Sequence, residues 1–250
     1  MGAYKNNIFG NKYGSEYLLG LVGYYPLNSN GNDLSGKGYN GTVVGTPTYS
    51  TGKVSNAIDF GNNTNSNYID IPDNSDFSFT NGTNDVPFSV SMWINITAVS
   101  STGNWFINKR NTTSGGDEWQ IMLSGSRFRI NKFQYNSNAS FQDIYSNVNP
   151  FLLNTWYHIC VTDAGTANIN DCKLYINGVL SVSGRATTGT YTRMNNGTSI
   201  TRIGVSAWGF SNTLKHKGLI DELAIWKNRE LTATEVLGLY TKGSSGLPII

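Results

Sequence analysis

Charged residues are scarce in this chain of 250 residues: Asp, Glu, Lys and Arg make up 14% of it, and the formal net charge is +2. This composition excludes the strongly basic surface by which proteins bind nucleic acids or anionic membranes. Long apolar runs are also missing, and none approaches the roughly 18 residues of a transmembrane helix. Residues 1–20 contain no apolar stretch typical of a signal peptide. We therefore expect no nucleic-acid partner and no membrane span.

The scarcity of Glu and His bears on catalysis. The sequence has five Glu and two His. A retaining glycosidase needs two carboxyl groups about 5–5.5 Å apart, which on a strand places the acids two or four positions apart. No two acidic residues are separated by two positions here, and His158 and His216 have no Ser or Cys nucleophile arranged beside them. We therefore expect a protein that is not an enzyme.

Cysteine and proline are rare as well, with two and six residues, whereas Gly reaches 28. Cys160 and Cys172 are accompanied by no further soft ligands, so they do not make a zinc site. They lie in neighbouring strand-like runs, and the sequence leaves a disulfide open. Free, buried thiols are favoured, because no secretion signal indicates an oxidising compartment.

What the sequence does contain is a series of short apolar runs, separated at a spacing of roughly ten residues by turns rich in Gly, Asn, Ser and Thr. Residues 88–96 alternate between apolar and polar, as a half-buried strand does. Asn177-Gly178 indicates a tight hairpin. Thr232 and Glu235 form a capping box at the start of one helix. We predict an all-β fold, a two-sheet antiparallel jelly-roll sandwich with one short C-terminal helix.

The run "GLIDELAIWK" places two acids, Asp221 and Glu222, side by side in apolar surroundings. On a strand adjacent side chains point to opposite faces, so the two carboxylates cannot act together on one bond. Simple alternation would place Asp221 on the same face as Leu219, Leu223 and Ile225. Burying a lone carboxylate is costly unless it is hydrogen-bonded or binds a metal. We therefore expect Asp221 to be structural and Glu222 to point elsewhere.

Several motifs together resemble the laminin-G-like domains of the concanavalin A-like lectin/glucanase superfamily. The resemblance covers residues 21–240 and rests on "GLVGYYPLNSNGNDLSGKGYNGTV", "FSVSMWI", "WYHICVT", "KLYINGVL" and "GLIDELAIWKNRELTATEVLGLY", in this order. It implies a two-sheet jelly roll in which the first and last motifs lie side by side, with Asp33 near Asp221. It also implies a structural calcium ion at the rim, held by Asp33, Asn40 and Asp221, since Ca²⁺ takes six to eight oxygen ligands. The alternative is that Asp33 and Asp221 accept backbone N–H groups in a tight corner.

A carbohydrate site combines an aromatic ring with short polar side chains on loops. Trp208 and Phe210 lie in the polar, Gly-containing run "GVSAWGFSNTLKHKG" and are the first candidates for ligand binding. Trp105 and Trp119 are the next. The alternative for each of them is packing in the core or against another protein.

The chain divides into an N-terminal arm (1–20), a laminin-G-like domain (21–243) and a C-terminal tail (244–250) that we expect to leave the domain. The arm is too apolar for a free tail, so we expect it to bind other virion or surface proteins in an oligomer or larger assembly, through Ile8, Phe9, Tyr13 and Tyr17. The function we predict is a non-catalytic surface recognition or adhesion module: a structural or decoration protein of a bacteriophage virion, presenting a lectin-like domain for host glycans. The alternatives are a secreted bacterial carbohydrate-binding protein at the cell surface and a glycoside hydrolase.

Overall fold

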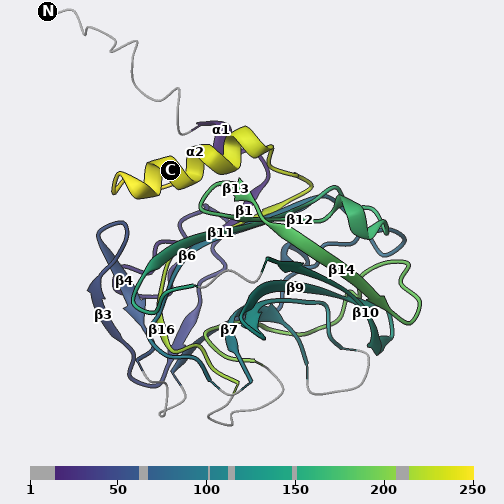
Figure 1. Cartoon of the computed structure of the whole chain (residues 1–250), viewed down its shortest axis with the longest axis horizontal. Coiled ribbons are helices and arrows are strands. Elements are labelled where there is room, and N and C mark those ends of the chain that lie inside the picture. The colour runs from purple at the N-terminus through teal and green to yellow at the C-terminus, as the bar shows by residue number, and fades with distance from the viewer. Residues whose placement is uncertain (1–14, 62–66, 101, 112–115, 148–150, 207–213) are drawn as a thin grey trace, which may run out of the picture.

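The computed structural model describes residues 15–61, 67–100, 102–111, 116–147, 151–206 and 214–250. Two antiparallel sheets of eight strands each lie face to face as a sandwich (Figure 1). The predicted all-β, two-sheet architecture is therefore confirmed. Among the described residues, no helix is long and apolar enough to cross a membrane.

Sheet A is centred on two long neighbouring strands, β6 (Phe88–Ile96) and β16 (Gly218–Lys227). On one side of β6 follow β11 (Trp156–Asp163), β12 (Lys173–Ile176) and β13 (Val179–Leu180). On the other side, β16 pairs with β4 (Asn56–Asp59), which pairs with β3 (Thr48–Thr51), and β16 also pairs with β1 (Leu21–Tyr25). The first and last strands of the chain are therefore neighbours, as the resemblance implied.

Sheet B has an order that begins with β14 (Val182–Thr188), β10 (Ser137–Ser146), β9 (Arg127–Gln134) and β8 (Trp119–Ser124). It continues with β7 (Asn104–Lys109), β15 (Thr201–Ile203), β5 (Tyr68–Ile71) and β2 (Thr42–Val44). Two short 3₁₀ turns, η1 (Ser75–Phe77) and η2 (Ile169–Asp171), lie in the connections.

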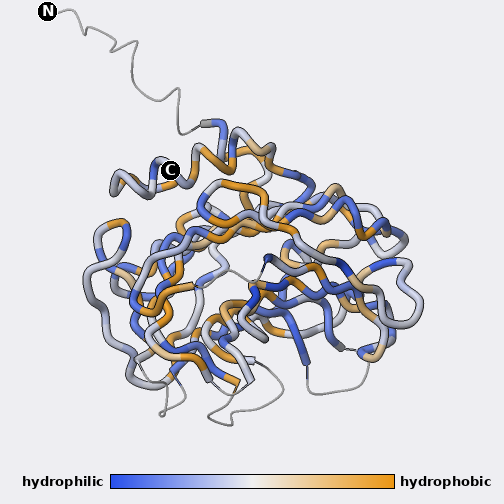
Figure 2. The backbone as a smooth tube through the Cα atoms, in the orientation of Figure 1, coloured by the Kyte–Doolittle hydropathy of each residue, from blue (hydrophilic) through white to orange (hydrophobic). Residues whose placement is uncertain are grey.

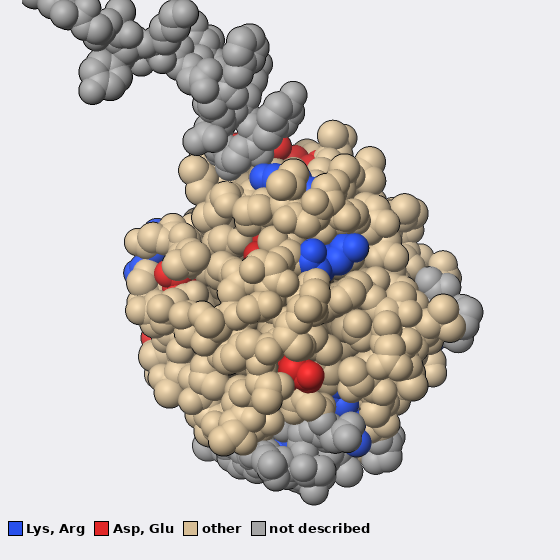
Figure 3. All heavy atoms as spheres, turned by 90° about the vertical axis from the view of Figure 1, so that its left-hand side faces the viewer, with Lys and Arg blue, Asp and Glu red and all other residues tan. Residues whose placement is uncertain are grey.

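The core fills the space between the sheets with the inward-facing side chains of the central strands. In β6 the predicted inward row is buried and belongs to the main apolar cluster: Phe88, Val90, Met92, Ile94 and Ile96. The facing rows of sheet B include Ile121, Leu123, Ile130 and Ile144. Figure 2 shows the apolar residues following the strands, and Figure 3 shows a face on which charged side chains are sparse.

Two local predictions are confirmed by backbone geometry. Asn177 and Gly178 connect β12 to β13 with φ values of 51° and 77°, the positive values that a tight hairpin turn requires. Helix α2 (Ala233–Ser244) is capped by Thr232, whose hydroxyl accepts from the N–H of Glu235. The Glu235 carboxylate in turn accepts from the N–H of Thr232. This capping box satisfies N–H groups that would otherwise lack a partner.

A second apolar cluster lies between the outside of sheet A and the helices α1 (Ser15–Leu18) and α2. Tyr17 is 2% exposed there. Its hydroxyl donates to the carbonyl of Glu235 (3.1 Å), and its own carbonyl accepts from the Trp226 indole (2.7 Å). The prediction of Tyr17 as an assembly residue needs correction, because its ring packs within its own chain. Ile8, Phe9 and Tyr13 lie outside the described residues.

The C-terminal tail does not leave the domain, which corrects a second expectation. Ile249 is buried, and its N–H donates to Glu222 Oε2 at 3.0 Å. Its carbonyl accepts from Lys242 Nζ at 2.6 Å. The tail therefore lies against sheet A, tied to β16 and α2.

Strand β16 contains a bulge that corrects the alternation expected from the sequence. Asp221 pairs with Trp93, but Ala224 pairs with Ser91, so one extra residue is accommodated between them. Glu222 takes a φ of 50° at this point. A bulge shifts the side-chain alternation by one position. Ile220 therefore shares the inward face with Leu223 and Ile225, and all three lie in the main core.

The two cysteines are free and buried, as the sequence favoured. They belong to different apolar clusters: Cys172 lies in the core between the sheets, and Cys160 lies in the cluster beneath α2. They therefore face opposite sides of sheet A.

Candidate functional site

The outward face of sheet B, opposite to the core, carries a row of polar and aromatic side chains. Because alternate residues of a strand share a face, the inward Ile121, Ile130 and Ile144 leave their neighbours pointing outward. Strand pairing places Asp143 opposite Asn131, and Asn131 opposite Gln120. We call this surface the outer face of sheet B, defined by Trp105, Gln120, Met122, Arg129, Asn131, Asp143 and Tyr145.

A continuous chain of hydrogen bonds crosses four strands on this face; we call it the polar ladder. The Trp105 indole donates to Gln120 Oε1 at 3.2 Å, and Gln120 Nε2 donates to Asn131 Oδ1 at 2.7 Å. Asn131 Nδ2 donates to Asp143 Oδ1 at 3.0 Å, and the other carboxylate oxygen accepts from Arg129 at 2.6 Å. Each side chain orients the next, so the ladder is rigid before any ligand arrives.

Arginine and aromatic side chains flank the ladder. The Arg129 guanidinium lies 5.1 Å from the centre of the Tyr145 ring. On the other side, Arg110 lies 4.5 Å from the Phe133 ring and donates to Gln120 Oε1 at 2.6 Å. Stacked guanidinium groups keep their edges available as hydrogen-bond donors. The face thus combines flat aromatic surfaces with fixed donors and acceptors.

Asp143 on this face and Asp117 just before β8 are each paired with an arginine. Arg110 donates to Asp117 at 2.6 Å, and Arg129 donates to Asp143 at 2.6 Å. Burial raises the pKa of Asp143, and the Arg129 charge opposes that rise. Both carboxylates serve to hold an arginine in place, so the arrangement suits recognition of neutral, hydroxyl-rich groups better than proton transfer.

The structure separates the predicted ligand-binding tryptophans. Trp105 lies on the outer face, is 7% exposed and has its indole N–H bonded to Gln120. Trp119 is 0% exposed, stacks on Phe79 at 5.1 Å and donates to the carbonyl of Phe77 at 2.8 Å. Trp119 is a core residue, and its prediction as a ligand platform was wrong. Trp208 and Phe210 lie outside the described residues.

The other members of the ladder were not predicted from the sequence. A signal for them is present in β9, where polar residues occupy alternate positions of "RFRIN", and a weaker one in β8, where Gln120 is the one polar residue of "WQIML". The same alternation is typical of any half-exposed sheet. The lateral alignment of Gln120, Asn131 and Asp143 depends on strand register, which no single run reveals.

The residues proposed for calcium lie in two separate hydrogen-bonded corners. The Asp33 carboxylate accepts from the N–H groups of Tyr24 and Tyr39, both at 3.0 Å, and from the N–H and hydroxyl of Ser35, both at 2.9 Å. Asn40 Oδ1 accepts from the Asp33 N–H at 2.9 Å. Four donors thus already point at the Asp33 oxygens, an environment that suits an anion and not an added cation.

Asp221 and Glu222 each have their own set of partners. Asp221 Oδ2 accepts from the N–H groups of Lys53 and Val54, both at 2.8 Å. Glu222 accepts from the Tyr24 hydroxyl, which lies 2.9 and 2.8 Å from its two oxygens. Burial raises the pKa of both carboxyl groups to about 7.

These contacts do not fit a calcium ion held jointly by the three residues. No described contact joins Asp221 to Asp33 or Asn40. Asp221 Oδ1 accepts no hydrogen bond from a described residue, but one oxygen falls far short of the six to eight that Ca²⁺ takes. Within the described ranges, no group of three His, Cys, Asp or Glu is placed to hold a metal. Chelation tests whether the chain binds a calcium ion at all.

Comparison with solved structures shows the same fold in binding domains. Domain 4 of AbnA, an extracellular arabinanase from Geobacillus stearothermophilus solved with arabinotriose, is 22% identical with a TM-score of 0.63, over 88% of this chain and 98% of that one. The binding domain of Paraclostridial Mosquitocidal Protein 1 is 22% identical with a TM-score of 0.67, over 89% of this chain. A third structure is that of botulinum neurotoxin type C, a toxin whose cell entry depends on interaction with two ganglioside molecules. It is 17% identical with a TM-score of 0.63, over 92% of this chain.

The chain spans 52% of each of those two toxin chains. No curated protein gives a significant match. Residues 62–237, well over half of the chain, match the family described as the concanavalin A-like lectin/glucanases superfamily, Laminin_G_3. The protein is therefore a lectin-like domain that belongs to the concanavalin A-like lectin/glucanase superfamily.

Proposed function

We propose that this protein is a non-catalytic recognition module that binds glycans on the outer face of sheet B. The observation that carries the proposal is the polar ladder, which fixes amide, carboxylate and guanidinium groups in one row between Trp105 and Tyr145. Sugar rings present hydroxyl groups at their edges and C–H groups on their faces. A rigid row of donors and acceptors beside aromatic rings matches both features.

The structural neighbours support this reading. The arabinanase domain was solved with an oligosaccharide, and the neurotoxin work concerns gangliosides, which carry glycans. These two proteins bind different sugars on a shared fold, so the fold alone does not identify the sugar. The ligand class we propose is a neutral oligosaccharide, because Asp117 and Asp143 are already neutralised by arginine.

A non-catalytic role is supported by the same ion pairs. Glycoside hydrolysis requires one carboxyl group to donate a proton and a second to act as nucleophile or base. Asp143 on the outer face is bound at 2.6 Å to Arg129, and Asp117 beside it is bound at 2.6 Å to Arg110. Both carboxylates are engaged in holding an arginine, an arrangement that suits neither the proton donor nor the nucleophile that the reaction needs.

The test is binding of the purified protein to an oligosaccharide array that includes arabinan fragments, followed by titration calorimetry on the best ligand. We expect Arg129→Ala and Tyr145→Ala to weaken binding at least about tenfold, since each removes a hydrogen-bonding or stacking group. Leu180→Ala is the matched control: Leu180 is 55% exposed on β13 of the other sheet. Binding that survives both outer-face changes would show that the glycan binds elsewhere.

We further propose that the domain is displayed on the surface of a particle or a cell, and the setting we predict is a bacteriophage virion. Exposed apolar side chains near α1 and α2 support this proposal, because they offer a surface by which the domain could be attached. Leu18, Leu19, Leu237 and Leu247 are between 48% and 74% exposed. Leu237 and Leu247 line a groove of about 460 Å³, together with Tyr17 and Gly238. Removing residues 1–14, which leaves the packed Tyr17 in place, should preserve the fold and abolish assembly in light scattering. Unchanged assembly would contradict the proposal.

A further inference from the structure

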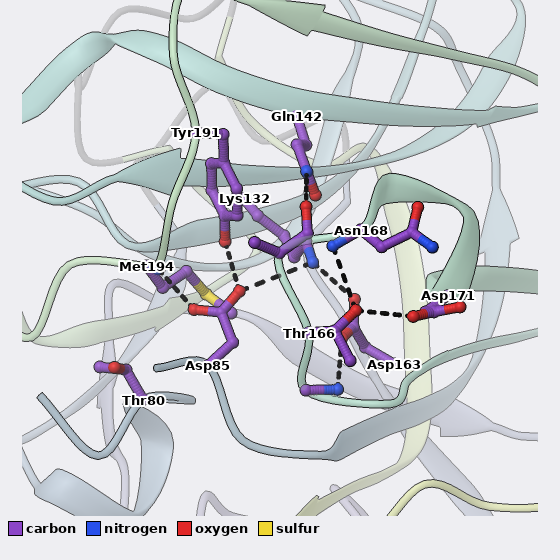
Figure 4. A network of polar contacts seen from close by, with 12 residues as sticks. Thr80, Asp85, Lys132, Gln142, Asp163, Thr166, Asn168, Asp171, Tyr191 and Met194 are labelled. Carbon is purple, nitrogen blue, oxygen red and sulfur yellow. Dashed lines mark hydrogen bonds and ion pairs between the residues drawn. The ribbon is translucent and has the colours of Figure 1, made fainter. Parts of the chain in front are cut away.

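A buried ionic cluster connects the two sheets at the side of the core. Lys132 of β9 lies inside the sandwich with Nζ 2.7 Å from Asp163 Oδ2 at the end of β11 (Figure 4). A second carboxylate, Asp85 in the loop before β6, lies 3.8 Å from the same nitrogen. All three side chains are 0% exposed. An amine and two carboxylates thus share one site from which water is excluded.

The surroundings hold both carboxylates in defined orientations. Asp163 Oδ1 accepts from the N–H of Gly165 at 2.8 Å, which leaves Oδ2 facing the amine. Asp85 Oδ2 accepts from the Tyr191 hydroxyl at 2.7 Å, and Asp85 Oδ1 accepts from the N–H of Met194 at 2.5 Å. Figure 4 shows Asp85 and Asp163 on opposite sides of the Lys132 nitrogen.

We propose that Lys132 and Asp163 condense to form an intramolecular amide bond that links sheet B covalently to sheet A, with Asp85 as the proton carrier. In this step Lys132 Nζ bonds to Asp163 Cγ, and the bond between Cγ and Oδ2 breaks. Of the three ammonium protons, one stays on the amide nitrogen and two leave with Oδ2 as one water molecule. Asp85 accepts a proton from Nζ, passes it to the departing oxygen and ends unchanged. The ammonium and carboxylate charges cancel, and no oxidant or reductant is needed.

Proximity favours this reaction. Groups held in reactive contact react as though present at effective concentrations of up to about 10⁵–10⁸ M. The Gly165 N–H on Oδ1 withdraws electron density from the carbonyl and stabilises the oxygen charge that develops when the amine attacks. Exclusion of water protects the amide from hydrolysis.

Removal of charge also favours the amide. Each ion of a buried pair has lost its hydration at a high cost in free energy, and condensation replaces both ions with a neutral group. Burial alone would lower the pKa of Lys132, but the neighbouring carboxylates outweigh it and raise the pKa. The amine is therefore charged before reaction and needs a base. Burial raises the pKa of Asp85, which makes this carboxylate a better proton acceptor.

The protein contains a second buried lysine that serves as a comparison. Lys109 Nζ lies 2.7 Å from Glu118 Oε1 and 2.7 Å from Asp73 Oδ1. The Asp73 side chain is 34% exposed, so water reaches that cluster. Lys109 therefore lacks a sealed site with a second buried carboxylate, and we expect it to remain a free amine.

The experiment is mass spectrometry of the intact, full-length protein after denaturation. We expect a mass lower than that of the sequence by one water molecule, and after protease digestion a branched peptide that joins residues 132 and 163. Asp85→Asn should restore the full mass, because the near-isosteric amide keeps its shape but cannot carry the proton. Lys109→Met is the matched control and should retain the loss of water.

Folding of each variant is checked by circular dichroism, so that a full mass is interpreted only for folded protein. The wild-type measurement needs no variant and decides the matter alone. A folded wild type that keeps the full sequence mass after prolonged incubation, with no branched peptide, overturns the proposal. Loss of water in Lys132→Met would also overturn it, because the linkage would then be at another site.

Discussion

Ionisation of Glu222 is predicted to lower the stability of the folded protein as the pH rises. Burial raises the pKa of this group from 4.5 to about 7, and the bonds from Tyr24 and Ile249 offset part of that effect. The folded state therefore keeps a proton that the unfolded chain releases. This contribution is fully present below about pH 4.5 and is lost as the pH rises to about 7. A pKa that is higher by about 2.5 in the folded state, at about 1.4 kcal/mol per pKa unit, amounts to about 3.5 kcal/mol.

The perturbation is Glu222→Gln, which has nearly the same shape and no charge. Its Oε1 accepts from the Ile249 N–H, and its Nε2 donates to the Tyr24 hydroxyl oxygen. The free energy of unfolding is measured by urea titration at about pH 5 and about pH 8. Between these values we expect the wild type to lose on the order of 1–3 kcal/mol more than the variant. At the higher pH, the variant should be the more stable protein.

Glu230→Gln is the control, because Glu230 is a partly exposed Glu paired with Lys173. Burial lowers the pKa of His158 to about 3 and that of His216 to about 4. Because their pKa values are lowered, these histidines reduce stability as the pH falls, the opposite of the effect of Glu222. They are present in all three proteins, so their contribution cancels when the proteins are compared. If Glu222→Gln and the wild type lose stability in parallel, the reasoning about Glu222 is refuted.

Three further predictions concern the calcium ion, the helix cap and catalysis. EDTA should leave the melting temperature unchanged, because four donors already occupy the Asp33 carboxylate; a fall of several degrees that calcium reverses would support the ion instead. Thr232→Ala should cost about 0.5–2 kcal/mol in urea titrations, through loss of the capping box, and no change would mean that α2 is held by packing alone. Pure protein should release no reducing sugar from β-glucan, and an activity lost in Glu118→Gln would contradict the non-catalytic proposal.

Features set by neighbouring residues were predictable from the sequence. The alternation of 88–96, the turn at Asn177-Gly178 and the cap at Thr232 depend on local periodicity and turn chemistry, and each is confirmed. Such patterns act within a few residues, so reading one segment is sufficient to infer them.

Features set by contacts between distant segments were not predictable. The bulge at Glu222 depends on how β16 aligns with β6. It places Leu223 on the same face as Ile220, whereas simple alternation would place the two on opposite faces. The polar ladder requires the register of four strands, from Trp105 to Asp143. Trp119 was misassigned because the glycine-rich run before it resembles a ligand loop, whereas its alternation partner Ile121 shows that it points inward. A one-residue change of register reverses every such assignment.

The position of α1 and α2 gives the domain a direction. Both helices pack on the outside of sheet A, so the first and last described residues lie on that side (Figure 1). The outer face of sheet B points the opposite way. A tether at either end of the described chain would therefore leave the polar ladder turned toward the surroundings. Several copies joined side by side through their helical sides would present their ladders in one plane, and weak individual contacts would then add up to firm attachment.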